Sequence, residues 1–186
     1  MRLELTGPLA VGLGLCTIYR NGCMDVPVAR RNGIRWKGRA MAKIEKKYWT
    51  LLALASAKGE SLSPVQLQKT LFLFGRKMPA AVKHDYYNFI PYNYGPFDPV
   101  IYSDAEVLTA ESLVVLQERP GCRWSEYAAT PRGIALAEKI KNSVPGKELR
   151  YLDGLVEWVR SLSFRDLLRT VYAEYPDYAV NSVFRE

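Results

Sequence analysis

The sequence predicts a mainly α-helical fold with a small β-hairpin, in which a winged-helix-like core is followed by a C-terminal helical hairpin. Apolar residues recur at intervals of three and four in most segments beyond residue 43, which is the period of an amphipathic helix. The dipeptides Ser63-Pro64 and Thr130-Pro131 combine a capping residue with the proline that suits a first helical position. Two short β-prone runs precede Thr130, and helices followed by such a hairpin and another helix are typical of a winged helix.

The first forty residues differ in composition from the rest of the chain. Residues 1–40 hold seven Lys or Arg and two acidic residues, a charge of +5, whereas residues 41–186 hold nineteen and seventeen, a charge of +2. Gly and Pro interrupt their apolar start, and the basic tract that follows has no helical period. We expect a poorly ordered extension or an upstream over-reading of the start codon. A signal peptide, a lipid anchor and a basic arm that grips phosphates are the open alternatives.

Two helices are predicted between residues 44 and 79. The first, residues 44–58, places its apolar side chains on one face and ends at Gly59. The second begins after Ser63 and ends at Pro79. Within it we expect Lys69 to be solvated. Gln68 either is solvated too or bonds to the backbone of the Tyr-Gly-Pro segment, because a buried amide must find partners.

The stretch YNFIPYNYGPFDP, residues 87–99, is rich in aromatic residues and proline. Residues 86–91 predict a short strand with Tyr87, Phe89 and Pro91 on one face. A turn follows, because Gly95 permits a positive φ and Pro96 fixes the next residue, and the next helix begins after Asp98. The aromatic side chains either belong to the core or form a rigid recognition surface.

The second half of the chain predicts a hairpin and three helices. The runs LVVLQER and SEYAAT form two strands that PGCRW joins, and Thr130 caps the helix that follows. Residues 147–160 and the segment after Ser163 carry apolar stripes, with Asp166 completing a weak capping box. We expect residues 41–144 to form the winged-helix-like domain and residues 145–186 to be a helical extension packed on it.

The composition gives little support to catalysis or metal binding. There is one histidine, His84, and the three cysteines form no close CxxC pair. No serine or cysteine lies in a nucleophile elbow, and no phosphate-binding loop is present. We therefore expect a protein that is not an enzyme and has no cofactor, metal or membrane association. Because the cysteines show no disulfide pattern, we expect a cytoplasmic location.

Three short motifs occur in a distinctive order: Leu67-Gln68-Lys69, then Tyr94-Gly95-Pro96 with Tyr102 behind it, then Ser112-Leu113-Val114. This order resembles the Panacea domain, the SocA-like antitoxin family of bacteria and phages, which has a K-L-Q-K-L-like helix, a Y-G-P motif and a G-L-I that enters the wing. The resemblance covers residues 44–140. Ser112 stands where that family has glycine, and the C-terminal YPDYAVNSVF lies outside the shared part.

The resemblance implies a non-enzymatic module that neutralises a partner toxin or delivers it to a protease. An apolar concavity over the Tyr-Gly-Pro turn would favour such a protein partner. Arg76 and Lys77 at one helix end are candidate contacts. The other candidates for the contact, or for the turn that shapes it, are Gln68, Tyr92, Tyr94, Gly95, Pro96, Phe97 and Tyr102.

The alternative is a DNA-binding transcriptional regulator of the winged-helix class. Its contacts would come from the basic N-terminal tract and from Arg119, Arg123 and Arg132, and a continuous positive face that joins these arginines would favour it. The helix that would enter the major groove, residues 98–111, carries four acidic residues and no Lys or Arg. That is the wrong sign for a polyanion, so nucleic acid is the less favoured partner.

Overall fold

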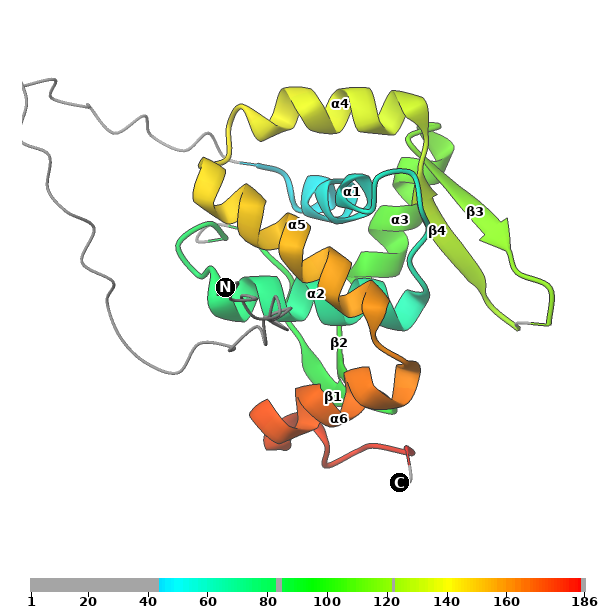
Figure 1. Ribbon diagram of the computed structural model, residues 1–186, viewed down its shortest axis with the longest axis vertical. Coiled ribbons are helices and arrows are strands. Elements are labelled where there is room, and N and C mark those ends of the chain that lie inside the picture. Colours follow the sequence, from blue (N-terminus) through cyan, green and yellow to red (C-terminus); the bar gives the residue numbers. More distant parts are fainter. Residues whose placement is uncertain (1–43, 83–84, 122, 185–186) are drawn as a thin grey trace, which may run out of the picture. The chain divides into compact units, whose positions relative to one another are not determined.

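The computed structural model describes residues 44–82, 85–121 and 123–184. This part of the chain is mainly helical, with six α-helices and two small antiparallel two-stranded sheets (Figure 1). The expected extension at residues 1–40 lies outside the described residues, as do His84 and all three cysteines. The elements are α1 (Lys46–Ser56), α2 (Pro64–Lys77), β1 (Ile90–Tyr92), β2 (Gly95–Phe97), α3 (Val100–Ala110), β3 (Val114–Glu118), β4 (Ser125–Ala129), α4 (Pro131–Lys141), α5 (Gly146–Ser161), α6 (Phe164–Glu174) and the short 3-10 helix η1 (Pro176–Tyr178).

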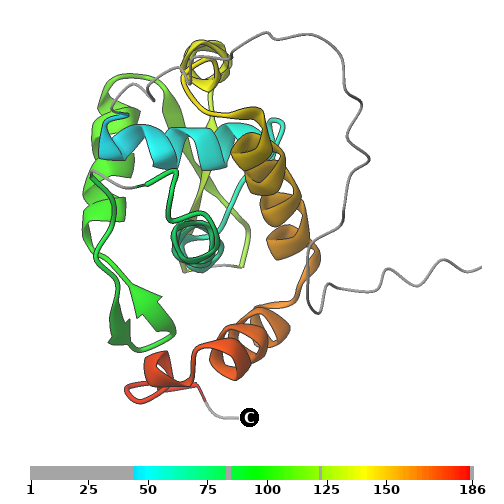
Figure 2. The ribbon, with the colours of Figure 1, turned by 90° about the vertical axis from the view of Figure 1, so that its left-hand side faces the viewer.

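Helix α2 lies in the middle of the fold. Figure 2 shows it end-on, with α1 passing over it, α5 along one side, and the β1–β2 hairpin and α6 on the side opposite α1. Residues 67–74 of α2 are all buried, as are residues 49–56 of α1. The spacing of apolar residues predicted one buried face for α1, but both helices are covered on all sides in these stretches, which is typical of core helices.

The predicted helix starts are present. Ser63 and Gln66 form a complete capping box at α2, and the Thr130 hydroxyl accepts a hydrogen bond from the Gly133 backbone N–H at α4. At α6 the Ser163 hydroxyl accepts from the Asp166 N–H. The Asp166 carboxylate accepts from the Ser163 hydroxyl at 2.6 Å rather than from its backbone, so the expected second half of that capping box does not form.

The two sheets are separate hairpins. Strands β3 and β4 pair from Val114 opposite Ala129 to Glu118 opposite Ser125, as the sequence predicted. The strand expected at residues 86–91 is β1, and it begins later than expected, at Ile90. It pairs with β2, a strand that the sequence did not predict, because Gly95-Pro96 indicated only a turn.

The two C-terminal helices pack on the rest of the fold. Helix α5 lies against α1 and α2, and α6 lies against α2, β2 and η1. Their main contacts are therefore with the core and with the β1–β2 hairpin, not with each other as in a helical hairpin. None of the helices described is long and apolar enough to span a membrane.

Candidate functional site

Helix α2 holds the Tyr-Gly-Pro hairpin by its backbone. The Gln68 amide nitrogen donates to the Asp98 carbonyl at 2.9 Å, and its amide oxygen accepts from the Asp98 N–H at 3.0 Å. Lys69 donates from Nζ to the Pro96 carbonyl at 2.9 Å. Gln68 thus takes the buried alternative, although it bonds two residues beyond the Tyr-Gly-Pro motif. The expectation that Lys69 is solvated is wrong, because its side chain lies under the hairpin and Lys69 is 2% exposed.

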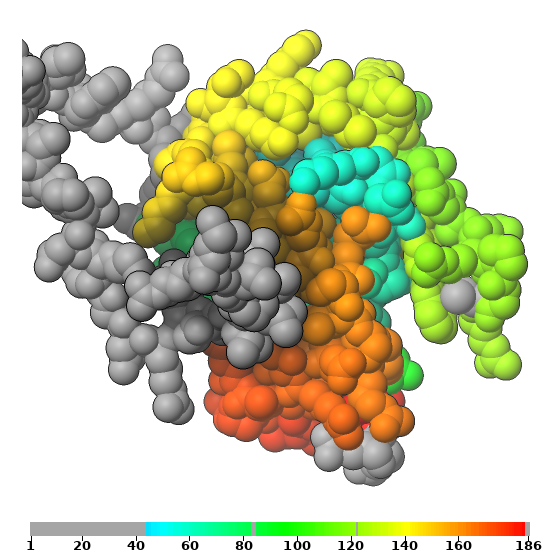
Figure 3. Space-filling model, viewed as in Figure 1, coloured from blue at the N-terminus to red at the C-terminus, as the bar shows by residue number. Residues whose placement is uncertain are grey.

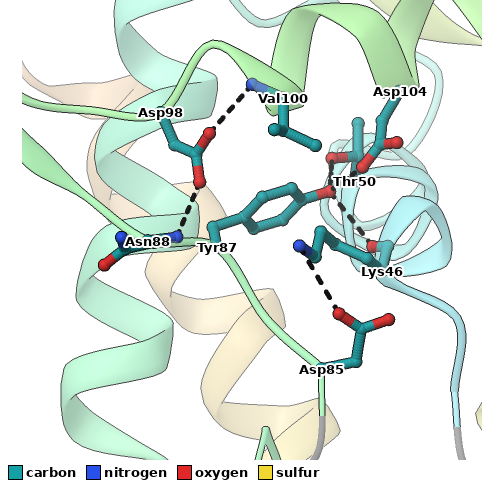
Figure 4. Close-up of polar contacts among 8 residues, drawn as sticks. All are labelled: Lys46, Thr50, Asp85, Tyr87, Asn88, Asp98, Val100 and Asp104. Atoms are coloured by element: carbon teal, nitrogen blue, oxygen red, sulfur yellow. Dashed lines mark hydrogen bonds and ion pairs between the residues drawn. The ribbon is translucent and has the colours of Figure 1, made fainter.

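Asp98 ties the hairpin to its two flanking segments. Its buried carboxylate accepts from the Asn88 N–H at 2.6 Å, before β1, and from the Val100 N–H at 2.9 Å, at the start of α3 (Figure 4). Asp98 therefore performs the capping role that the sequence predicted. One carboxylate fixes the directions in which the chain enters and leaves the β1–β2 hairpin.

A second buried polar cluster lies beside it, around the Tyr87 hydroxyl (Figure 4). This oxygen is 2.7 Å from the Thr50 hydroxyl, 2.7 Å from an Asp104 carboxylate oxygen and 3.0 Å from the Lys46 carbonyl. Burial raises the pKa of Tyr87 far above its usual value, and burial also raises the pKa of Asp104. The cluster joins the aromatic segment to α1 and α3, and it is structural because Tyr87 is buried.

The C-terminal segment holds the hairpin from the opposite side. The Val183 N–H donates to the Asn93 carbonyl at 2.9 Å, and the Asn181 side chain donates to the Pro91 carbonyl at 3.1 Å. Gly95 has φ +89°, and an added Cβ would lie 2.9 Å from Cε1 of Tyr172 on α6. The hairpin is therefore clamped between α2 and a C-terminal segment that lies outside the resemblance.

Four aromatic side chains form a continuous row from this hairpin to β4. The ring centroids of Tyr92 and Phe97 are 4.8 Å apart in a stacked arrangement, those of Phe97 and Tyr102 are 5.6 Å apart, and those of Tyr102 and Tyr127 are 6.4 Å apart. Tyr92 is exposed, and the other three are half-buried. We call Tyr92, Phe97, Tyr102 and Tyr127 the aromatic row. It ends at Leu116 on β3, which pairs with Tyr127 and is 48% exposed.

The remaining candidates from the hairpin lie elsewhere. Gly95 and Pro96 are buried and shape the turn rather than a surface. Tyr94 is exposed, but its ring meets Phe164 edge-on with the centroids 5.4 Å apart, on the α6 side of the hairpin. Of the hairpin residues that the sequence singled out, Tyr92 and Phe97 are thus the ones that the structure places in one row with Tyr102.

Arg76 and Lys77 link α2 to the C-terminal segment. Arg76 donates to the Tyr178 hydroxyl at 2.6 Å and lies over the rings of Phe72 and Tyr178, and Lys77 forms an ion pair with Glu174. Arg76 also borders a cavity of about 310 Å³ lined by aromatic residues of α2 and of the segment before β1. This cavity lies beside that segment and not over the Tyr-Gly-Pro turn, where a concavity was expected to favour a protein partner.

The arginines proposed for DNA do not form one patch. Arg119 lies at the tip of the β3–β4 hairpin, 3.1 Å from the carboxylate of Glu126, and Arg123 lies exposed at the same tip. Arg132 lies at the start of α4, beyond the other end of the hairpin. Five paired residues separate the two ends, a distance of about 15 Å. Arg132 therefore lies apart from the two arginines at the tip.

Sequence reasoning missed Lys69, Asp98 and Tyr127 as parts of this site. Asp98 was identified as a helix cap, and its Asp-Pro dipeptide is a visible signal, but the bond to Asn88 depends on the hairpin. Tyr127 alternates with inward-facing residues of its strand, and nothing in the sequence shows that it stacks on Tyr102. Lys69 carries no sequence signal of burial, since lysine is almost never fully buried.

No group of His, Cys, Asp and Glu among residues 44–82, 85–121 and 123–184 could hold a metal ion. No protein-family model matches this chain, and no curated protein matches it.

Proposed function

We propose that this protein is a non-catalytic, cytoplasmic protein-binding module of the antitoxin type, which neutralises or delivers a toxin and contacts it through the aromatic row. In this proposal the winged-helix-like core consists of α1, α2, α3, the β3–β4 hairpin and α4. Winged-helix folds often bind DNA, and we propose that this one binds a protein instead. The fold does not decide the partner, so the proposal depends on the surface.

The observation that carries the proposal is the aromatic row itself. Tyrosine and phenylalanine are enriched among residues that dominate protein–protein binding energy, and paired rings lose little conformational freedom on binding. Tyr92 leaves about half of its surface open and is supported from beneath by Phe97. Leu116, on the same strand face as Tyr127, extends the apolar surface at the other end.

The row stands on a rigid support. Gln68 and Lys69 fix the backbone of residues 96–98 from below, while Asn181 and Val183 fix residues 91 and 93 from the other side. Because the hairpin is already ordered, binding at Tyr92 and Phe97 loses little conformational entropy. This favours a higher affinity for the partner.

The charges beside the row favour a protein over DNA. Helix α3 supplies Tyr102 to the row and exposes Glu106, and it carries no Lys or Arg. The negative potential of Glu106 adds to burial in raising the pKa of Tyr127. A polyanion would meet this carboxylate directly, whereas a protein partner can supply a compensating charge.

The test is capture of partners by the full-length chain from a lysate of its own host, with and without nuclease, followed by mass spectrometry. The variants Tyr92→Ala and Phe97→Leu should each lower recovery of a captured protein about fivefold or more, since row contacts are expected to cost about 1–3 kcal/mol each. Trp124→Ala is the matched control, because Trp124 is an exposed aromatic residue outside the row.

Retention of one small protein after nuclease treatment, with loss in the two row variants and not in Trp124→Ala, is the expected result. Loss of every partner on nuclease treatment would indicate the DNA-binding regulator instead. Equal recovery by the row variants and the wild-type chain would show that the row is not the interface.

A further inference from the structure

The outer edge of β3 offers backbone groups that the described part of the chain does not use. Strand β4 lies between β3 on one side and Leu62 on the other. The Tyr127 N–H donates to the Leu62 carbonyl at 2.9 Å, and the Tyr127 carbonyl accepts from the Leu62 N–H at 2.9 Å. Both backbone polar groups of Tyr127 therefore point away from β3.

This direction settles which groups of β3 are free. In an antiparallel pair, opposite residues alternate between those that bond to each other and those whose polar groups point outward. Tyr127 is opposite Leu116, so this is a pair of the second kind. The N–H and C=O of Leu116 consequently point away from β4, and by the two-residue period so do those of Val114 and Glu118. Val114 is 2% exposed, so the accessible part of this edge is Leu116 and Glu118.

Beta-strand edges are usually protected against pairing, and among the described residues the charge of Glu118 is the one such device on β3. Proline, lysine and bulges are the common devices, and β3 has the sequence VVLQE, without proline or lysine. Val115 and Leu116 are 41% and 48% exposed. Figure 3 shows the β3–β4 hairpin standing out from the helical body, and Figure 1 shows β3 as its outer strand.

Two carboxylates next to this edge have no counter-charge among the residues that the structure describes. Glu118 lies on the same strand face as Leu116, and Glu106 lies close enough to Tyr127 to act on its hydroxyl. Neither forms an ion pair or hydrogen bond with any residue that the structure describes. Arg119, which follows Glu118 in the chain, is paired with Glu126 instead.

We infer that β3 is a docking edge on which an extended segment of the partner protein pairs as an added strand, with an apolar residue beside Leu116 and Tyr127 and lysine or arginine facing Glu106 and Glu118. The inference rests on the proposed function, because it names the kind of partner segment that would continue the aromatic row. Backbone pairing supplies affinity, and the side chains on alternate positions supply specificity.

The probe is a capped synthetic peptide, TKVFVKT, titrated into the full-length protein and followed by backbone amide NMR shifts. With its phenylalanine opposite Leu116, both lysines lie on the same face as Leu116, and one is opposite Glu118. We expect saturable binding with the largest shifts in residues 114–118. N-methylation of the peptide phenylalanine, which keeps every side chain, should weaken binding roughly tenfold by removing a backbone hydrogen bond. The acidic peptide TEVFVET should bind at least tenfold more weakly than TKVFVKT.

The matched protein variants are Leu116→Pro and Leu116→Thr. Because the Leu116 N–H is outside the β3–β4 ladder, proline there removes the outward donor and should leave the fold intact, as a melting curve would show. Leu116→Pro should weaken the peptide roughly tenfold more than Leu116→Thr, which keeps the N–H. If Leu116→Pro unfolds, the N-methylated peptide still decides the question.

Several outcomes would overturn the inference: no saturable binding of TKVFVKT, equal binding of its N-methylated form, or shifts confined to residues outside β3. None of these outcomes bears on capture of a partner by the aromatic row. Conversely, capture that survives Tyr92→Ala and Phe97→Leu would overturn the proposed function whatever the peptide does.

Discussion

The two hairpins of this protein have the same antiparallel pairing and opposite kinds of support. The β1–β2 hairpin has three residues in each strand, and two buried side chains of α2 and the exposed Asn181 of the C-terminal segment bond to its backbone and to the residue that follows it. The β3–β4 hairpin has five residues in each strand, with Leu62 paired to β4 and no described residue paired to the outside of β3. One hairpin is held through its backbone by groups of other elements, and the other is anchored by the side chains of Val114 and Ala129 in the hydrophobic core.

The difference teaches where rigidity and availability come from in a small fold. A short hairpin is marginally stable by itself, so β1–β2 keeps its shape through side chains that belong to other elements. The longer β3–β4 hairpin can leave one edge open. The aromatic row runs across both, so one end of the proposed interface is preformed and the other can still accept hydrogen bonds.

The largest effect is expected where β3–β4 joins the body, at Gly133 on α4. An added Cβ would lie 2.0 Å from the Leu113 carbonyl oxygen, a backbone atom that already accepts from the Thr130 N–H. Gly133→Ala should lower the free energy of unfolding by about 3 kcal/mol or more, because backbone must move to relieve the overlap. Urea unfolding measures it. Gly154→Ala is the control, since nothing lies within 4 Å of its added Cβ and a helical alanine should stabilise by about 0.5–1 kcal/mol. Equal effects of the two substitutions would mean that α4 is free to shift.

The next effect compares the turns of the two hairpins. Gly95 and Gly121 have similar positive φ values, +89° and +82°, but an added Cβ meets the Tyr172 ring at 2.9 Å in the first and nothing within 4 Å in the second. Gly121→Ala should cost about 1 kcal/mol from backbone strain alone, and Gly95→Ala about 2–3 kcal/mol because the overlap is added. Thermal and urea unfolding of both variants test this. A cost at Gly95 no greater than at Gly121 would show that α6 does not clamp the turn.

The third effect concerns Lys69, the buried lysine that donates to the backbone of the β1–β2 hairpin. No buried lysine among the described residues bonds to the backbone of the β3–β4 hairpin in this way. Burial lowers the pKa of Lys69 to about 7, from an ordinary value of 10.5. Between these values the unfolded chain binds a proton that the folded chain does not, so stability should rise as the pH rises. From pH 7 to pH 9 we expect the free energy of unfolding to increase by about 2 kcal/mol through this group.

Lys69→Met is the control for that pH dependence. It keeps the length of the side chain and removes the amine, so the rise between pH 7 and pH 9 should largely disappear. At pH 7 its stability should be close to that of the wild-type chain, because the lost bond to the Pro96 carbonyl is offset by removal of a buried amine. A rise of the same size in both proteins would show that Lys69 is not its source.

The sequence predicted the local structure better than the contacts across the fold. Ser63, Thr130 and Ser163 mark three helix starts correctly, because caps depend on a few neighbouring residues. The β3–β4 hairpin was predicted from two short β-prone runs and a Pro-Gly turn, which are also local. Strand β2 was missed, because only its pairing with β1 distinguishes it from the end of a turn.

The site depends on contacts between residues far apart in the chain, and those were predicted least well. Gln68 and Asp98 are thirty residues apart, and Tyr102 reaches Tyr127 through packing of α3 on the sheet. Lys69 was expected in solvent because a lysine in a helix is normally solvated, and its burial follows from α2 being covered on all sides. The aromatic segment was recognised as important, but its exposed members could not be separated from its buried members by pattern alone.

The smallest effect is expected from the charges at the tip of the β3–β4 hairpin, and its smallness is informative. Arg119 is bonded to Glu126, but its side chain is 67% exposed, so the pair should contribute less than about 0.5 kcal/mol. Arg119→Ala should therefore leave the urea midpoint almost unchanged, and Glu126 retains its bond from the Ser61 hydroxyl at 2.5 Å. Glu126→Ala should cost more, about 1 kcal/mol or more, because it leaves Ser61 without its partner next to the Leu62 bridge. Equal losses of stability in Arg119→Ala and Glu126→Ala would mean that the ion pair at the tip stabilises the hairpin. The expected inequality would place the support of the hairpin at Ser61 and Leu62, on the side of β4 away from β3, rather than at its charged tip.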